Sequence, residues 1–130
     1  MTFGSSAAVI ASALLAVLSG FQLGLALGAP WGAAAWGGRN PGVLPAGLRV
    51  ASAIVGIGIY PLFALVILAA GRLIADDWLP VAPEVAMWVA TGFFLVGTLV
   101  NAISRSRIER IWAPVSLALA ICSAVVALAR

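Results

Sequence analysis

Four uninterrupted apolar stretches constrain this chain more than any other feature of its sequence. They cover residues 7–28, 50–70, 85–104 and 111–129, and none of them contains Asp, Glu, Lys, Arg or His. Each is close to the ~20 residues that an α-helix needs to cross a ~30 Å hydrocarbon core. Lipid offers no partner to backbone N–H and C=O groups, so such a stretch satisfies them internally as a helix. The sequence therefore predicts an all-α membrane protein, a four-transmembrane-helix bundle that forms a single domain over residues 1–130.

The composition supports this prediction. Hydrophobic residues make up 64% of the chain and charged residues 8%, whereas soluble domains carry about a quarter charged residues. The first stretch could instead be a cleaved signal peptide, but residues 1–6 lack a basic side chain and the apolar run is long enough to span. The basic balance, 7 Lys and Arg against 4 Asp and Glu, rests on too few charges to indicate nucleic acid as a partner.

The arginines are distributed unevenly over the loops. Those of the first and third loops are Arg39, Arg49, Arg105, Arg107 and Arg110. On the opposite side, the sequence has only Arg72 and Arg130. The positive-inside rule therefore predicts a multi-pass protein of a bacterial inner (plasma) membrane, with loops one and three cytoplasmic and both termini outside. The arginines of loops one and three are also candidate contacts for anionic lipid head groups, at about 1 kcal/mol each.

The first loop contains a further apolar segment. Residues 30–38 begin with a helix-compatible proline and end in a glycine pair that stops a helix. We expect a short segment lying in the membrane interface there. The tryptophans fall at or near the expected span ends, which is the distribution of an aromatic belt: Trp31, Trp36, Trp78, Trp88 and Trp112.

Small residues in the first stretch predict how its helix packs. Inside lipid, helices associate where small side chains let their backbones approach closely. The first stretch carries such residues at a spacing of four, and its strongest part is Ala16, Gly20, Gly24 and Gly28. This small-residue ridge is expected to seat the first helix inside its own bundle or, alternatively, to mediate self-association.

The second stretch contains a predicted helix kink at Gly56, Gly58 and Pro61. Pro61 lacks the N–H that would bond to the carbonyl of Ile57, and its ring crowds that carbonyl. The kink is either static or a moving hinge. Proline and glycine are common in transmembrane helices, which favours the static interpretation.

The expected spans hold few polar side chains, and polar groups inside a membrane are the default candidates for function. Gln22, Tyr60 and Asn101 form the candidate polar site. Gln22 is expected to hydrogen-bond across a helix interface or to line a small polar cavity. Asn101 falls in the last turn of the third span, where it is expected to cap the helix end or to bond to Ser104 and the following turn.

The residue inventory excludes most catalytic chemistry. The chain has no His and no Lys, and its single cysteine, Cys122, lies in the fourth stretch, so His-based triads, Cys–His dyads and Schiff-base chemistry are excluded. Asp76 and Asp77 are adjacent in an outer loop and do not converge on one ion. We therefore expect no catalytic residue, no metal and no cofactor, and a lipid-modifying enzyme is only a distant alternative.

Several short segments, mainly in loops one and three, resemble those of other proteins. The segments are GAPWG at 28–32, WGG at 36–38, PGVLP at 41–45, and Asn101 followed by SRSRIER at 104–110. With these segments the chain resembles small uncharacterised four-helix bacterial integral membrane proteins to which no activity is assigned. The resemblance implies that loops one and three form the distinctive surface of that family. It implies no catalytic or binding residue.

These observations favour a small non-enzymatic membrane protein. It would be a subunit, an assembly factor or a lipid-interacting component, with membrane lipid and a second copy or another membrane protein as partners. The alternative is a carrier or channel for a small neutral solute, which would use the candidate polar site around the Pro61 kink.

Overall fold

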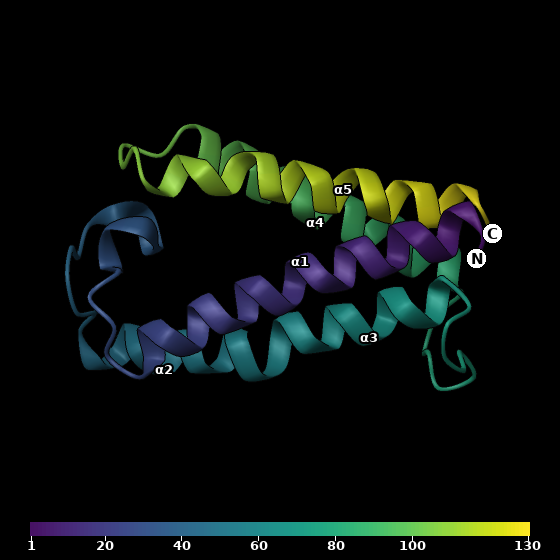
Figure 1. Cartoon of the computed structure of the whole chain (residues 1–130), viewed down its shortest axis with the longest axis horizontal. Coiled ribbons are helices and arrows are strands. Elements are labelled where there is room, and N and C mark those ends of the chain that lie inside the picture. Colours follow the sequence, from purple (N-terminus) through teal and green to yellow (C-terminus); the bar gives the residue numbers. More distant parts are fainter.

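The computed structural model describes all 130 residues as an all-helical chain with 4 helices long and apolar enough to cross a membrane. These helices are α1 (Phe3–Ala26), the segment Ala46–Ala70, α4 (Pro83–Ala102) and the segment Glu109–Leu128. Both termini lie at one end of the bundle, and the loop between α1 and α2 and the loop between α4 and α5 lie at the other (Figure 1). The predicted four-transmembrane-helix bundle is confirmed.

All four spans begin a few residues earlier than the apolar stretches indicate, and all but the second also end earlier. α1 begins after Thr2, whose side-chain oxygen accepts a hydrogen bond of 3.0 Å from the N–H of Ser5. It ends before Gly28, which has a φ of +100°, a conformation that terminates helices and favours glycine. α4 begins at Pro83 with Glu84 in its first turn, where a negative charge meets the helix N-terminus. Gly28 therefore lies outside the first helix.

The second span changes its hydrogen bonding halfway along. It consists of α2 (Ala46–Ile54), the π-helical turn η3 (Val55–Ile59) and α3 (Tyr60–Ala70). The N–H of Tyr60 bonds to the carbonyl of Val55, five residues back, directly before Pro61. A wider turn accommodates a proline that has no N–H to donate. The disturbance takes this π-helical form at the residues that indicate a kink in the sequence: Gly56, Gly58 and Pro61.

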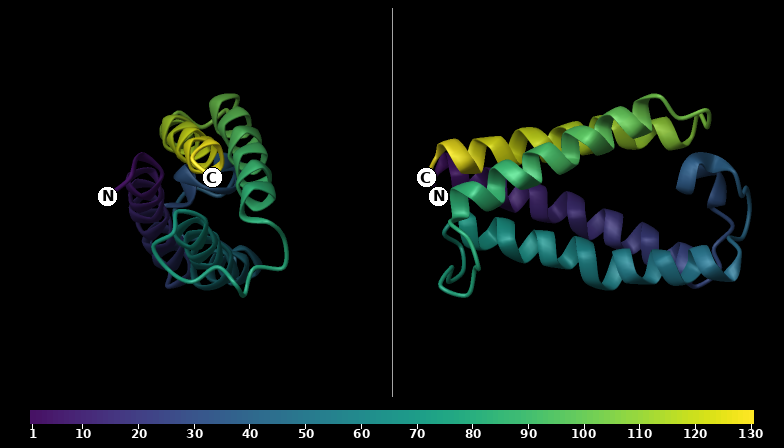
Figure 2. Two further views of the ribbon diagram at one scale, coloured as in Figure 1. Left: turned by 90° about the vertical axis from the view of Figure 1, so that its right-hand side faces the viewer. Right: turned by 180° about the vertical axis from the view of Figure 1, so that it is seen from behind.

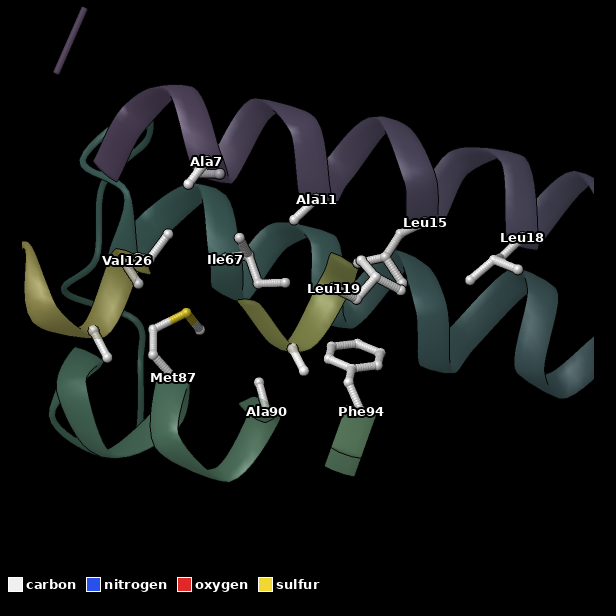
Figure 3. Close-up of a cluster of buried hydrophobic side chains, with 14 residues drawn as sticks. Ala7, Ala11, Leu15, Leu18, Ile67, Met87, Ala90, Phe94, Leu119 and Val126 are labelled. Atoms are coloured by element: carbon white, nitrogen blue, oxygen red, sulfur yellow. The ribbon is translucent and has the colours of Figure 1, made fainter. Parts of the chain in front are cut away.

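One apolar core holds the four spans together (Figure 3). α1 contributes small residues near its start and larger ones further along, from Ala7 and Ala11 to Leu15 and Leu18. Their side chains meet those of the other three spans, among them Ile67, Met87, Phe94, Leu119 and Val126. Because alanines line the first turns of α1, the helices approach most closely at the end that carries the termini.

The small-residue ridge lies largely outside this core. Ala16 and Gly20 are exposed, and a Cβ added at Gly20 would have no heavy atom within 4 Å. Gly24 faces the ring of Trp31, and Gly28 faces the guanidinium of Arg49. At Ala16 and Gly20 the structure corrects the expectation that the ridge seats the first helix in its own bundle, because that face of α1 points outward. Self-association through the exposed face stays a prediction.

Arg130 connects the second loop to the fourth span at the end of the bundle that carries the termini. Its Nη2 lies 3.0 Å from Asp76 Oδ2, and its Nη1 donates a hydrogen bond of 3.1 Å to the carbonyl of Ala70. Its Nε lies 4.0 Å from Glu84 Oε1. The second loop is therefore tied to the fourth span through Asp76, whereas Asp77 is exposed.

Candidate functional site

The four spans form two pairs that diverge toward the end opposite the termini. α1 and the second span make one pair, and α4 and α5 (Trp112–Leu128) make the other (Figures 1 and 2). The loop between α1 and α2 folds back at the open end between the pairs (Figure 2). It contains two short 3₁₀ helices, η1 (Gly32–Ala34) and η2 (Trp36–Gly38). We call residues 29–45 the roof segment.

A cavity of about 190 Å³ lies beneath the roof segment. All four spans contribute polar side chains to its wall: Gln22, Tyr60, Asn101, Glu109 and Ser116. Trp36 of the roof segment and Trp112 of α5 add aromatic surface. For comparison, a dry engineered cavity of about 150 Å³ holds a benzene molecule. The structure thus brings the three residues of the candidate polar site to one cavity.

Hydrogen bonds tie the roof segment to both helix pairs. Trp36 Nε1 donates to Ser52 Oγ on α2 at 2.9 Å, which connects the roof segment to the first pair. Trp112 Nε1 donates to the carbonyl of Ala34 at 2.9 Å, which connects it to the second pair. The hydroxyl of Ser106 also donates to a roof carbonyl, that of Ala33. Trp36 and Trp112 therefore make internal bonds in addition to any contact with the membrane interface.

Glycines allow the roof segment to turn this tightly. The N–H of Gly32 donates to the carbonyl of Gly42 at 2.8 Å, which closes the segment on itself. A Cβ at Gly32 would lie 2.7 Å from the oxygen of Gly42 and closer still to that of Asn40. Gly37 has a φ of +79°, in the left-handed region that glycine favours. The apolar segment of loop one is thus packed into the bundle end, with Ala34 and Ala35 buried.

Glu109 is the functional candidate that sequence reasoning missed. The fourth helical segment begins at Glu109 rather than at residue 111, and the residue is 5% exposed. Its Oε2 accepts a hydrogen bond of 2.7 Å from the N–H of Gly37. The finding corrects the expectation that the spans contain no ionisable side chain. The available signal is the single acid in the arginine-rich run 104–110.

Gln22 and Asn101 differ in how well the protein satisfies them. The Oε1 of Gln22 is buried and has no hydrogen-bond partner. The amide of Asn101 donates to Ser116 Oγ on α5 at 3.4 Å, a long hydrogen bond across the cavity wall. The side chain of Asn101 therefore bonds to α5 rather than to the end of its own helix, while the expected contact with Ser104 is made by the backbone, where the N–H of Ser104 donates to the carbonyl of Asn101 at 3.3 Å. Buried polar groups are rarely left unpaired, so Gln22 Oε1 requires an explanation.

Tyr60 lies between the cavity and the outer surface of the bundle. It lines the inner cavity and also a larger apolar groove between α1 and the second span, which Gly20 and Pro61 border. Its position directly after the π-helical turn places it at the irregular part of the second span. π-helical turns occur frequently at functional sites because they displace side chains from the regular helix register.

The arginines of loops one and three lie at the cavity end but do not line the cavity. Two of them bond to backbone carbonyls: Arg49 Nε donates to Ala26 at 3.0 Å, and Arg110 Nε donates to Ser104 at 2.7 Å. Four of the five are exposed, Arg110 among them; the others are Arg39, Arg105 and Arg107. Contact between these side chains and lipid head groups stays a prediction.

The chemistry of the cavity is that of hydrogen bonding. Its wall offers two hydroxyls, two carboxamides and one carboxylate, and no group of three or more His, Cys, Asp or Glu side chains that could hold a metal ion occurs in the chain. Comparisons with protein-family models, with curated proteins and with solved structures find no match. Fold and site together define the chain as a multi-pass, all-α membrane protein with a cavity to which all four spans contribute polar side chains.

Proposed function

We propose that this protein binds a small polar solute in the cavity and carries it across the membrane without altering it chemically. One observation carries the proposal: Gln22, Tyr60 and Asn101 come from three different spans and line the same cavity. Polar side chains inside a membrane commonly mark a substrate path. The unpaired Oε1 of Gln22 supports the proposal further, because a bound solute with an N–H or O–H group would satisfy it.

The arrangement favours a carrier over an open channel. The cavity lies at one end of the bundle, and the apolar core around Leu15, Ile67 and Leu119 fills the bundle toward the termini. A solute can therefore cross only if the helix pairs rearrange. The π-helical turn at Val55–Ile59 is the irregular element next to the cavity that such a movement can use.

The arginine distribution orients the proposed carrier. Five arginines lie in the loops at the cavity end, and two lie at the end that carries the termini. By the positive-inside rule, the cavity end with its roof segment faces the cytoplasm of a bacterial cell and both termini face outward. In this orientation the solute enters or leaves the cavity on the cytoplasmic side.

Uptake into proteoliposomes tests the proposal. Three probes of nearly equal shape, acetamidinium, acetamide and acetate, offer a cation, a neutral solute and an anion. At least one should enter faster than into protein-free vesicles. Uptake should fall about tenfold in Gln22→Leu, which matches the loss of one buried hydrogen bond of about 1.4 kcal/mol, and it should also fall in Tyr60→Phe.

Thr91→Val is the matched control for these variants. The hydroxyl of Thr91 bonds to the carbonyl of Met87 on its own helix and lies outside the cavity, so this variant should transport normally. The proposed carrier would be contradicted if all three probes entered no faster than they enter protein-free vesicles. It would also be contradicted if Gln22→Leu left the uptake unchanged.

A second candidate is a subunit or assembly factor that binds another membrane protein. It rests on the outward face of α1, where a Cβ added at Gly20 would meet no atom within 4 Å and a partner helix could approach closely. A stoichiometric partner that co-purifies in mild detergent, together with absent uptake, would favour this candidate over the carrier.

A further inference from the structure

Glu109 is the one charged side chain that lines the cavity. Both ion pairs in the molecule are made by Arg130 at the opposite end, so no arginine nitrogen lies within 4.0 Å of the Glu109 carboxylate. Its only hydrogen bond to the protein is the one that Oε2 accepts from the N–H of Gly37. The carboxylate is thus buried without a positive partner.

A buried carboxylate in this position is incompletely compensated. The N–H of Gly37 and the N-terminus of the helical segment Glu109–Leu128 stabilise it in part. A charge that is largely removed from water and has no ion-pair partner nevertheless carries a desolvation cost, and a cation held against it offsets part of that cost. The cavity itself is where such a cation has room.

The remaining wall suits the same ligand. The unpaired Oε1 of Gln22 is a second acceptor, and the rings of Trp36, Tyr60 and Trp112 present faces that attract organic cations. The arginines of loops one and three do not line the cavity, and salt and water screen the charge of the exposed ones over about 8 Å. Glu109 is thus the charged group that faces the cavity, since no arginine lines its wall.

We infer that the transported solute is a small organic cation with N–H groups, of the amidinium or alkylammonium class and about the size of benzene or slightly larger. The inference rests on the proposed carrier function and specifies its substrate class. It replaces the neutral solute of the sequence-based alternative, because that alternative assumes a cavity without an ionisable side chain. Glu109 then binds the cation, and Gly37 of the roof segment positions the carboxylate.

Glu109→Gln separates a binding role from a purely structural one. A glutamine keeps an oxygen that can accept the hydrogen bond from Gly37, but it removes the charge. The roof segment therefore stays attached in either case, and only a role in cation binding makes the variant selective among probes. The matched control is Glu84→Gln, at the start of α4 near the termini, where the carboxylate side chain is 47% exposed.

The test compares uptake of acetamidinium, acetamide and acetate by proteoliposomes that contain each protein. After uptake by protein-free vesicles is subtracted, the wild type should take up acetamidinium about tenfold faster than acetamide, a preference of about 1.4 kcal/mol, and should show no uptake of acetate. Glu109→Gln should abolish that preference by slowing acetamidinium while acetamide changes little. Glu84→Gln should behave as the wild type.

Failure of this inference differs from failure of the proposed function. If the wild type takes up acetamide or acetate at least as fast as acetamidinium, and Gln22→Leu stops that uptake, the carrier stands and its cationic substrate is refuted. Unchanged selectivity in a folded Glu109→Gln protein refutes the inference in the same way. If none of the probes enters faster than into protein-free vesicles, both proposals are contradicted. If a variant does not fold, the preference of the wild type for acetamidinium over acetamide decides by itself whether the inferred cationic substrate stands.

Discussion

Replacing Gly32 with alanine should detach the roof segment while the four spans stay helical. The added Cβ would lie 2.7 Å from the oxygen of Gly42 and nearer still to that of Asn40. Both neighbours are backbone atoms of the same tight loop and cannot rotate away, so the loop has to open. We expect the roof segment to lose about 3 kcal/mol of local stability, the upper range for overpacking.

Hydrogen exchange measures this loss directly. Amides of residues 30–42 should exchange about a hundredfold faster in Gly32→Ala, because each 1.4 kcal/mol changes the opening equilibrium tenfold. Amides of the core turns of α1 should keep their protection. Gly47→Ala is the control, since a Cβ there meets no atom within 4 Å. If the roof-segment amides of Gly32→Ala exchanged as slowly as those of the wild type, the described loop geometry would be contradicted.

Filling the cavity with Val55→Phe should stop solute uptake without destabilising the bundle. Val55 lines the cavity at the start of the π-helical turn, and about 190 Å³ is available to the larger side chain. Filling a void recovers dispersion contacts, so the thermal unfolding midpoint should stay equal to that of the wild type or rise. Uptake should fall at least about tenfold, because the ring occupies the space that the solute needs.

Val50→Phe provides the same substitution outside the cavity. Val50 is 61% exposed on the outer face of α2, so its variant should retain both stability and uptake. The pair distinguishes a binding site from a packing defect. Stabilisation by Val55→Phe with undiminished uptake would mean that the cavity is only a void.

The sequence predicts the spans because long apolar runs without charge have few alternatives in lipid. It also predicts the candidate polar residues, since Gln22, Tyr60 and Asn101 are among the few polar side chains within those runs. The sequence does not predict that these three side chains line the same cavity. Their convergence depends on how the two helix pairs diverge, and helical periodicity does not encode the angle between pairs that are separated in the chain.

Two further features escape the sequence for physical reasons. Glu109 precedes the fourth apolar run, and an acid among arginines is ordinarily a solvated loop residue; only its burial beneath Gly37 distinguishes it. The roof segment is apolar, which is equally compatible with lying flat in the interface and with folding into the bundle. Hydrogen bonds of Trp36 and Trp112 to residues distant in sequence hold the segment against the bundle end, and the segment's own sequence does not encode these partners.

The accessibility of position 116 tests the central claim most directly. Ser116 lines the cavity, whereas Ser123 lies about two turns further along α5 with an exposure of 0%. In a Cys122→Ala background, Ser116→Cys should react with the small cationic reagent 2-aminoethyl methanethiosulfonate, and Val55→Phe should block the reaction. Ser123→Cys should remain unmodified. If Ser116→Cys is as unreactive as Ser123→Cys, solutes do not enter the cavity and the proposed carrier is contradicted.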